Sequence, residues 1–222
     1  MSISGNNHKP LTHGRVRGIL LDLDDTLYAY EPCHRARQAA AFGYLAKKLK
    51  KNEREIAKIF IAARTAVKQQ VPETGASHSR LLYFQRCIEI ATGRTDIRMA
   101  LETERISWKA YFSKMKLRLG AKAFLAAAKK RGVKIAVVSD LTTEIQMKKL
   151  IRLGIAHSID VLVTSEESGR DKPAPDSFRL ALKKMKLRPR DVVMIGDDAR
   201  RDRVGAHRMG IRFSTIHALL KS

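Results

Sequence analysis

Residues 16–27 have the sequence VRGILLDLDDTL. The first part, residues 16–23, is a short apolar run that ends in carboxylates, and this pattern predicts a strand buried on both faces of a sheet. The carboxylates belong to Asp22, Asp24 and Asp25. Because a carboxylate at the end of a buried strand needs a partner, the stretch predicts the first strand and also marks a place where chemistry is expected.

The chain after residue 119 alternates between strand and helix patterns. Strands are predicted over residues 133–138, 159–163, 192–195 and 212–216. Helices are predicted over residues 120–130, 142–153, 175–185 and 199–209. Strict alternation of this kind predicts an α/β fold, a Rossmann-like parallel sheet with helices on both faces, and the first strand is expected in the same sheet.

The chain between the first two predicted strands is helical throughout. Apolar residues recur at helical spacing over residues 33–50, 56–67, 81–91 and 100–112, as expected for amphipathic helices. We therefore expect an all-helical domain over residues 28–116, inserted after the first strand. The α/β core domain would consist of residues 16–27 and 117–222, and residues 1–15 would form a flexible N-terminal tail.

Polar residues follow the predicted strands at the sheet edge where an open α/β sheet places its site. They are Asp22 and Asp24 after the first strand, Ser139 and Asp140 after the second, Lys172 beyond the third, and Asp197, Asp198 and Asp202 after the fourth. Crowded carboxylates raise one another's pKa, so a cation is needed to offset the repulsion. Mg²⁺ suits oxygen ligands in a site that is open to phosphate. Asp22 and Asp197 are the expected direct ligands.

These motifs resemble those of the haloacid dehalogenase (HAD) superfamily, most of whose members are phosphatases. The four motifs stand in order over residues 16–216. They are Asp22-Leu23-Asp24-Asp25-Thr26-Leu27, Ser139, Lys172 within GRDKPAP, and Gly196-Asp197-Asp198-Ala199-Arg200-Arg201-Asp202. Because each motif follows a predicted strand, their agreement is far more specific than a single Asp-x-Asp. The resemblance also implies that the helical insertion is a C1-type cap closing over the site.

The resemblance implies a role for each catalytic residue. Asp22 would attack phosphorus and form an aspartyl phosphate. Asp24 would protonate the leaving oxygen and then deprotonate the attacking water. Ser139 would bind a phosphoryl oxygen, and Lys172 would neutralise phosphoryl charge and orient Asp22. Asp140 stands where similar sequences often have asparagine, so it would either contact substrate or position its loop.

The resemblance also implies the metal site. Mg²⁺ would be held by the carboxylates of Asp22 and Asp197 and by the backbone carbonyl of Asp24. Asp202 would support the ion through a bound water or by contacting the groups that ligate the ion. Asp198 is instead expected to cap the helix that follows it.

The expected reaction is hydrolysis of a small phosphorylated metabolite, such as a sugar phosphate or a nucleoside monophosphate. A 2-haloacid dehalogenase is disfavoured because halide leaves unprotonated, and such an enzyme does not need the acid that Asp24 provides. A phosphomutase keeps the same motifs and stays open as an alternative. His34, near the start of the insertion, either faces substrate or is an ordinary helix-start residue, and the second interpretation is preferred.

The net charge of +22 indicates an anionic partner or only a general excess of lysine and arginine. A basic nucleic-acid-binding protein on an inactive scaffold is therefore an alternative, but no nucleic-acid-binding motif accompanies the charge. Basic residues of the insertion would attract an anionic substrate or, as we prefer, form solvated helix faces. They are Arg35, Arg37, Lys47, Lys48, Arg64, Lys68, Arg80 and Arg86.

The remaining features concern location and assembly. Cys33 and Cys87 lie far apart, without the spacing of a metal or redox motif, and are expected as reduced thiols. No apolar run is long enough to span a membrane, and the N-terminal residues lack the apolar segment of a signal peptide. We expect a cytoplasmic protein that is a monomer or a homodimer.

Overall fold

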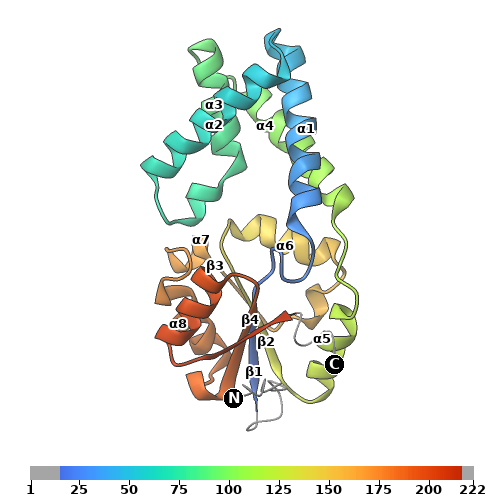
Figure 1. The fold of residues 1–222 in the computed structure, drawn as a ribbon, viewed down its shortest axis with the longest axis vertical. Coiled ribbons are helices and arrows are strands. Elements are labelled where there is room, and N and C mark those ends of the chain that lie inside the picture. The colour runs from blue at the N-terminus through green and yellow to red at the C-terminus, as the bar shows by residue number, and fades with distance from the viewer. Residues whose placement is uncertain (1–15, 217–222) are drawn as a thin grey trace, which may run out of the picture.

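The computed structural model describes residues 16–216, which form an α/β part and a helical part stacked end to end (Figure 1). The α/β part contains a five-stranded parallel sheet with the strand order β3-β2-β1-β4-β5. The strands are β1 (Gly18–Leu21), β2 (Lys134–Ser139), β3 (Val161–Thr164), β4 (Val192–Gly196) and β5 (Arg212–Thr215). The predicted Rossmann-like fold with a helical insertion after the first strand is confirmed.

Strand β1 occupies the middle of the sheet, and all of its residues are buried. Ile19 lies opposite Ile135 of β2 and Val193 of β4. At the start of the strand, a Cβ added to Gly18 would lie 2.5 Å from Leu187 Cδ1, so the close packing here favours glycine. Because both neighbours of β1 are strands, its backbone donors and acceptors are satisfied within the sheet.

Helices cover both faces of this sheet. They are α5 (Ala121–Lys130), α6 (Thr143–Arg152), α7 (Ser165–Ser168), α8 (Pro175–Met185) and α9 (Val204–Arg208). Ile19 and Leu21 pack in one core cluster with residues of α5 and α6, whereas Leu20 packs in a second cluster with residues of α8 and α9. Successive strand residues point to opposite faces, so a strand covered on both sides needs a continuous apolar run, as β1 has.

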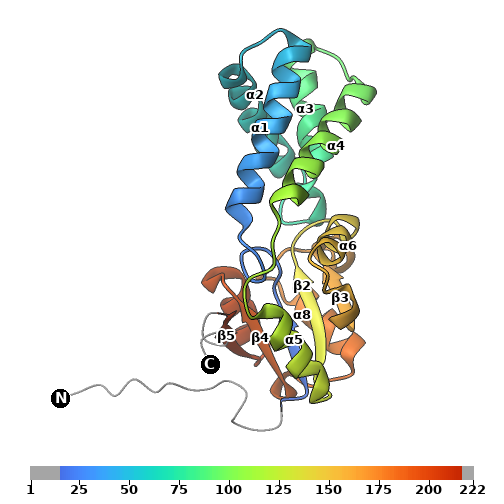
Figure 2. The same ribbon diagram turned by 90° about the vertical axis from the view of Figure 1, so that its right-hand side faces the viewer.

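Helices α1 to α4 form the helical part, which we call the cap, and they connect β1 to β2 (Figure 2). They are α1 (Tyr30–Leu49), α2 (Glu53–Gln70), α3 (Arg80–Thr92) and α4 (Ile97–Lys114). The cap has a core of its own, in which the ring of Phe60 packs against Tyr83 and Phe84. Trp108 and Tyr111 of α4 belong instead to the core cluster of the sheet, so they join the two parts. The limits of the cap domain, residues 28 and 116, stay a prediction.

The turn between α1 and α2 follows from local sequence. Lys50 adopts the left-handed conformation, with φ of 53°, and ends α1. Asn52 then accepts a hydrogen bond from the backbone N–H of Glu55, whose carboxylate accepts one from the N–H of Asn52. This reciprocal capping box satisfies donors at the start of α2 and explains why the helical pattern breaks at this point.

Several predicted elements differ from the structure. The helix predicted over residues 199–209 begins as a π-helical segment (Ala199–Arg203) before α9. The cause is the carbonyl of Asp198, which accepts a hydrogen bond from the N–H of Arg203 five residues later, as well as from Asp202. Helix α7 was not predicted. Neither were the short 3-10 helices Gly75–His78, Ala156–Ser158 and Pro189–Asp191.

Three other expectations concern the chain outside the sheet. The predicted N-terminal tail, residues 1–15, lies outside the described residues. Cys33 and Cys87 are both free and buried, so the prediction of unpaired thiols is confirmed. None of the helices within residues 16–216 combines the length and apolar character that crossing a membrane requires.

Candidate active site

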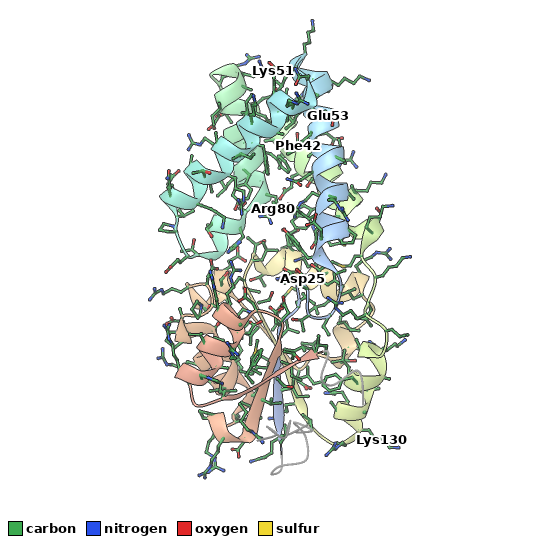
Figure 3. The ribbon with its side chains drawn as sticks, in the orientation of Figure 1. Asp25, Phe42, Lys51, Glu53, Arg80 and Lys130 are labelled. Atoms are coloured by element: carbon green, nitrogen blue, oxygen red, sulfur yellow. The ribbon has the colours of Figure 1, made fainter. Side chains whose placement is uncertain are left out.

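The carboxyl ends of the strands lie at the edge of the sheet that faces the cap (Figure 3). Asp22 follows β1, Ser139 ends β2, and Asp197 follows β4. All of the predicted site residues line a single cavity of about 460 Å³ between the sheet edge and the cap. They are Asp22, Asp24, Ser139, Asp140, Lys172, Asp197 and Asp202. The structure therefore brings together every residue that the motifs pointed to.

Lys172 is the centre of the contacts among the acids. Its Nζ lies 2.7 Å from Asp22 Oδ1 and 2.6 Å from Asp202 Oδ1, and it also donates to the carbonyl oxygen of Val138 at 3.1 Å. The hydroxyl of Thr26 lies 2.8 Å from Asp22 Oδ2 and 3.1 Å from Asp197 Oδ1. The orientation of the Asp22 carboxylate is thus set from both of its oxygens.

Burial and neighbouring charges shift the pKa values of these groups. Burial raises the pKa of Asp22 well above its usual range, and Asp202 raises it further, while Lys172 acts in the opposite direction. Burial also raises the pKa of Asp197. For Lys172, burial alone would lower the pKa, but Asp202 and Asp22 hold it well above the ordinary value. One ammonium therefore does not offset the whole negative charge of the cluster.

The carboxylate cluster fits a hard divalent cation. One oxygen of each of Asp22, Asp197 and Asp202 lies within 4.8 Å of the others. Asp22 and Asp202 are buried, whereas Asp197 is exposed, so the cluster opens on one side to water and to ligands. Both Asp202 oxygens already accept hydrogen bonds, from Lys172 and from the N–H of Asp198. Mg²⁺ prefers one or two carboxylates and keeps several waters, so the set matches direct ligation by Asp22 and Asp197 with Asp202 behind them.

Ser139 is oriented by a residue that the motifs did not reveal. Gln146 of α6 donates from Nε2 to the Ser139 hydroxyl oxygen at 2.6 Å, and both side chains are buried. With this hydrogen bond accepted, the Ser139 O–H is left to donate to another group. The arrangement suits a phosphoryl oxygen in the cavity.

Asp24 lies in a different environment from the three clustered carboxylates. Lys149 of α6 contacts both of its oxygens, at 2.6 and 2.8 Å, and the hydroxyl of Tyr28 also donates to it. The Tyr28 hydroxyl lies 2.5 Å from that of Tyr111. Burial would raise the pKa of Asp24, but Lys149 and then Tyr28 lower it overall. The structure therefore shows Asp24 as a paired carboxylate outside the cluster, and any contact with a metal would come from its backbone carbonyl.

Asp140 and Asp198 both support local backbone. Asp140 Oδ1 accepts a hydrogen bond from the backbone N–H of Lys172 at 2.9 Å, which fixes the loop that carries the lysine. Its Oδ2 lies 3.6 Å from Arg201 Nη1. Asp198 accepts hydrogen bonds from the N–H groups of Arg200 and Arg201, so its predicted capping role is confirmed.

Cap residues complete the cavity. The cap lies close to the α/β part at His78, whose Nε2 is 2.8 Å from Asp171 Oδ2. His34 lies in the first turns of α1 and also lines the cavity, so both interpretations of it stay open and a contact with substrate stays a prediction. The basic side chains of Arg37, Arg64 and Arg80 line the cavity as well. The interpretation as a solvated helix face is wrong for Arg37, which is buried, whereas Arg64 is exposed and Arg80 is half-buried while they line the cavity.

Lys149 and Gln146 contact the predicted site residues Asp24 and Ser139 but were not themselves predicted from the sequence. A signal was present, because Ile145 and Leu150 mark the apolar face of α6 and both polar residues fall next to them on that face. A buried lysine or glutamine on the core side of a helix needs a polar partner. The pattern could have identified both residues, but the identity of their partners depends on the fold.

Comparison with known proteins agrees with this geometry. The family model for haloacid dehalogenase-like hydrolases matches residues 16–210. The chain is 40% identical over 199 residues to a ribulose-1,5-bisphosphate 5-phosphatase of Halopiger xanaduensis, covering 87% of this chain and 81% of that protein. It is 30% identical over 220 residues to a phosphoserine phosphatase of Thermus thermophilus, covering 87% and 86%. The chain therefore belongs to the haloacid dehalogenase-like hydrolase family and is an enzyme.

Solved structures support the fold. A HAD phosphatase from Thermococcus onnurineus matches with a TM-score of 0.69 at 21% identity, over 89% of this chain and 84% of that one. A 2-haloacid dehalogenase from Pseudomonas syringae also matches with a TM-score of 0.69 at 21% identity, over 89% and 85%. Because a phosphatase and a dehalogenase match equally well, the fold alone does not select the reaction.

Proposed function

We propose that this enzyme is a Mg²⁺-dependent phosphatase that hydrolyses a small phosphorylated sugar through an aspartyl phosphate on Asp22. The observation that carries the proposal is the contact of Asp22 with Lys172, beside Asp197 and Asp202 and on a cavity wall. A carboxylate held by an ammonium, next to a set of oxygen ligands, is suited to attack a phosphate dianion. A solvated carboxylate would repel such a substrate.

Asp22 is the proposed nucleophile. One of its oxygens bonds to phosphorus as the bond from phosphorus to the sugar oxygen breaks, and water later releases inorganic phosphate from the aspartyl phosphate. Lys172 holds the carboxylate at 2.7 Å and offsets negative charge on the phosphoryl group. Ser139, whose oxygen already accepts from Gln146, donates its O–H to a phosphoryl oxygen.

Asp24 is the proposed general acid and base. In the first step it gives a proton to the leaving sugar oxygen, and in the second it takes one from the attacking water, so it ends the cycle as it began. The depressed pKa that Lys149 and Tyr28 impose favours the carboxylate that the second step needs. It opposes the protonated form that the first step needs, so the negative charge of an incoming phosphate beside Asp24 would have to raise this pKa. Lys149 is accordingly proposed as the residue that positions Asp24.

The cation would be held by Asp22, Asp197 and the backbone carbonyl of Asp24, with Asp202 acting through water. Bound Mg²⁺ would supply the positive charge that keeps Asp22 ionised despite its burial and that stabilises the phosphoryl oxygens. The three carboxylates within 4.8 Å of one another support this assignment.

The substrate class rests on the relatives and on the cavity. The relatives are named as phosphatases of ribulose-1,5-bisphosphate, of phosphoserine and, in Methanocaldococcus jannaschii, of glyceraldehyde 3-phosphate. All of these are small phosphate monoesters, and two are phosphorylated sugars. A cavity of about 460 Å³ is the size of a typical small-molecule site. We therefore place phosphorylated sugars ahead of nucleoside monophosphates.

The test is release of inorganic phosphate from an aryl phosphate, measured with Mg²⁺ and with a chelator. We expect turnover that requires Mg²⁺, and a loss of at least about 10³-fold in Asp22→Asn. Asp176→Asn, at the half-buried start of α8 and away from the cavity, is the charge-matched control. Equal rates for wild type and Asp22→Asn would refute the proposal. Chloride release from a 2-chloro acid would indicate a dehalogenase, and phosphate moved within a sugar rather than released would indicate a mutase.

A further inference from the structure

The cavity has a second charged wall, formed by three arginines from three helices of the cap. They are Arg37 of α1, Arg64 of α2 and Arg80 of α3. Cap arginines that do pair with carboxylates lie elsewhere: Arg35 with Glu31, Arg86 with Glu89, and Arg105 with Glu102. Within residues 16–216, no carboxylate oxygen lies within 4 Å of the three cavity guanidiniums. Among the described residues, no carboxylate therefore pairs with their charge.

Arg37 shows most clearly that a ligand is expected. Its side chain is buried, with the residue only 3% exposed, and its guanidinium lies 5.3 Å from the ring centre of Trp108 and 5.0 Å from that of Tyr111. Nη2 lies 2.7 Å from His34 Nδ1 and 3.1 Å from the Tyr30 hydroxyl. Nη1 has no hydrogen-bond partner among the described residues. A buried cationic donor without a partner is costly, and an anion in the cavity would satisfy it.

Neighbouring groups respond to the same positive charge. Burial, followed by Arg37, Arg80 and Arg64, lowers the pKa of His34 to about 4. Burial alone would raise the pKa of the Tyr30 hydroxyl, but Arg80 and Arg37 lower it overall. The hydroxyl of Tyr30 lies within 3.4 Å of Arg80 Nη2 as well as near Arg37, so it links the two guanidiniums.

We propose that Arg37, Arg64 and Arg80 form a second anion site, which binds a phosphate group of the substrate other than the one that is hydrolysed. This inference rests on the proposed phosphatase function and narrows it to small bisphosphates. Guanidinium forks bind phosphate oxygens in pairs. Three of them suit a dianion better than the single charge of a carboxylate.

Both groups of residues line the same cavity. Arg37 packs on Tyr111, whose hydroxyl lies 2.5 Å from that of Tyr28, and Tyr28 in turn donates to Asp24. Two aromatic side chains thus separate the arginine site from the proposed acid and base. Figure 3 shows Arg80 on the cap side and Asp25 on the sheet side of the space between the two parts. A cavity of about 460 Å³ that both groups line has room for a small sugar with a phosphate at each end.

The experiment measures binding in the Asp22→Asn protein, which does not depend on turnover. Calorimetry in the presence of Mg²⁺ compares ribulose 1,5-bisphosphate with ribulose 5-phosphate, which differ by one phosphate. We expect the bisphosphate to bind at least about tenfold more tightly. Adding Arg64→Gln or Arg80→Gln should reduce this ratio at least about fivefold. Arg64 is exposed on α2, so its substitution should leave the fold intact.

Arg54→Gln, on the same helix but outside the cavity, is the matched control and should preserve the ratio. Equal binding of the two sugars, or a ratio that is unchanged in both cavity variants, would overturn the second anion site. Tighter binding of 3-phosphoglycerate than of the bisphosphate would overturn it too, since the arginines would then recognise a carboxylate. Absence of phosphatase activity in the wild type is a separate result that refutes only the proposed function.

Discussion

Lys149 Nζ lies 2.6 Å from one carboxylate oxygen of Asp24 and 2.8 Å from the other. The lysine side chain is 1% exposed and that of Asp24 is 28% exposed, so the ammonium is the fully buried partner. Lys149 comes from α6, in the sequence after the cap, whereas Asp24 follows β1. The ion pair therefore holds the segment that leads from β1 into the cap against helix α6 of the α/β part.

The burial of Lys149 predicts an asymmetric effect on stability. Asp24→Asn leaves the buried ammonium without its counter-charge and should lower the free energy of unfolding by about 3 kcal/mol. This value is the low end for a broken buried pair, because Asp24 is partly exposed. Adding Lys149→Met removes the unpaired charge and should recover most of the loss. Urea denaturation of the variants is the measurement, and a double variant no more stable than Asp24→Asn would contradict this account.

The carboxylate cluster predicts stabilisation by Mg²⁺. At a concentration 100 times Kd, bound metal should add about 2.7 kcal/mol to the free energy of unfolding, which raises Tm by about 5 °C or more. Asp197→Asn removes an exposed member of the cluster and should abolish most of this shift. Asp176→Asn should keep it. A Tm that does not respond to Mg²⁺ in the wild type would exclude a cation at this cluster.

The environment of His34 predicts a specific loss of stability in acid. Its pKa is lowered to about 4 by burial and by the neighbouring arginines, whereas an unfolded chain binds this proton near pH 6.5. Between those values the unfolded state holds more protons, so stability should be present above pH 6.5 and fall as the pH drops toward 4. His34→Gln should lose less stability than the wild type over this window, by thermal unfolding. Parallel pH profiles for the two proteins would show that His34 has an ordinary pKa.

Gly196, at the end of β4, packs directly against the acid cluster, so a larger residue at this position should disturb the cluster. A Cβ here would lie 2.2 Å from Asp202 Oδ2, so Gly196→Ala must displace Asp202 from its contact with Lys172. We expect a loss of about 2 kcal/mol in stability together with a fall in Mg²⁺-dependent activity. Gly43→Ala is the contrasting control in helix α1. The nearest atom there is Glu53 Oε1 at 3.5 Å, and a gain of up to about 1 kcal/mol is expected.

The fold and the acids could be predicted because their signals are local. An apolar run followed by Asp22, and a similar run followed by Ser139, identify strands and their ends without any knowledge of distant contacts. One topological rule then suffices, since parallel strands place their carboxyl ends at one edge of a sheet. Helix details such as the π-helical start of residues 199–209 could not be predicted, because a competing backbone hydrogen bond to Asp198 decides them.

The sequence by itself thus determined the α/β class, the order of the motifs and the set of residues around Asp22. Only the tertiary structure decided how the charges are paired: Lys149 with Asp24 across 125 residues, and Arg37, Arg64 and Arg80 with no carboxylate among residues 16–216. The physical reason is that strand and helix patterns depend on neighbouring residues, whereas the cost of a buried charge depends on which side chains the fold brings within a few ångströms. A basic residue on a helix looks the same in sequence whether it faces solvent or a cavity.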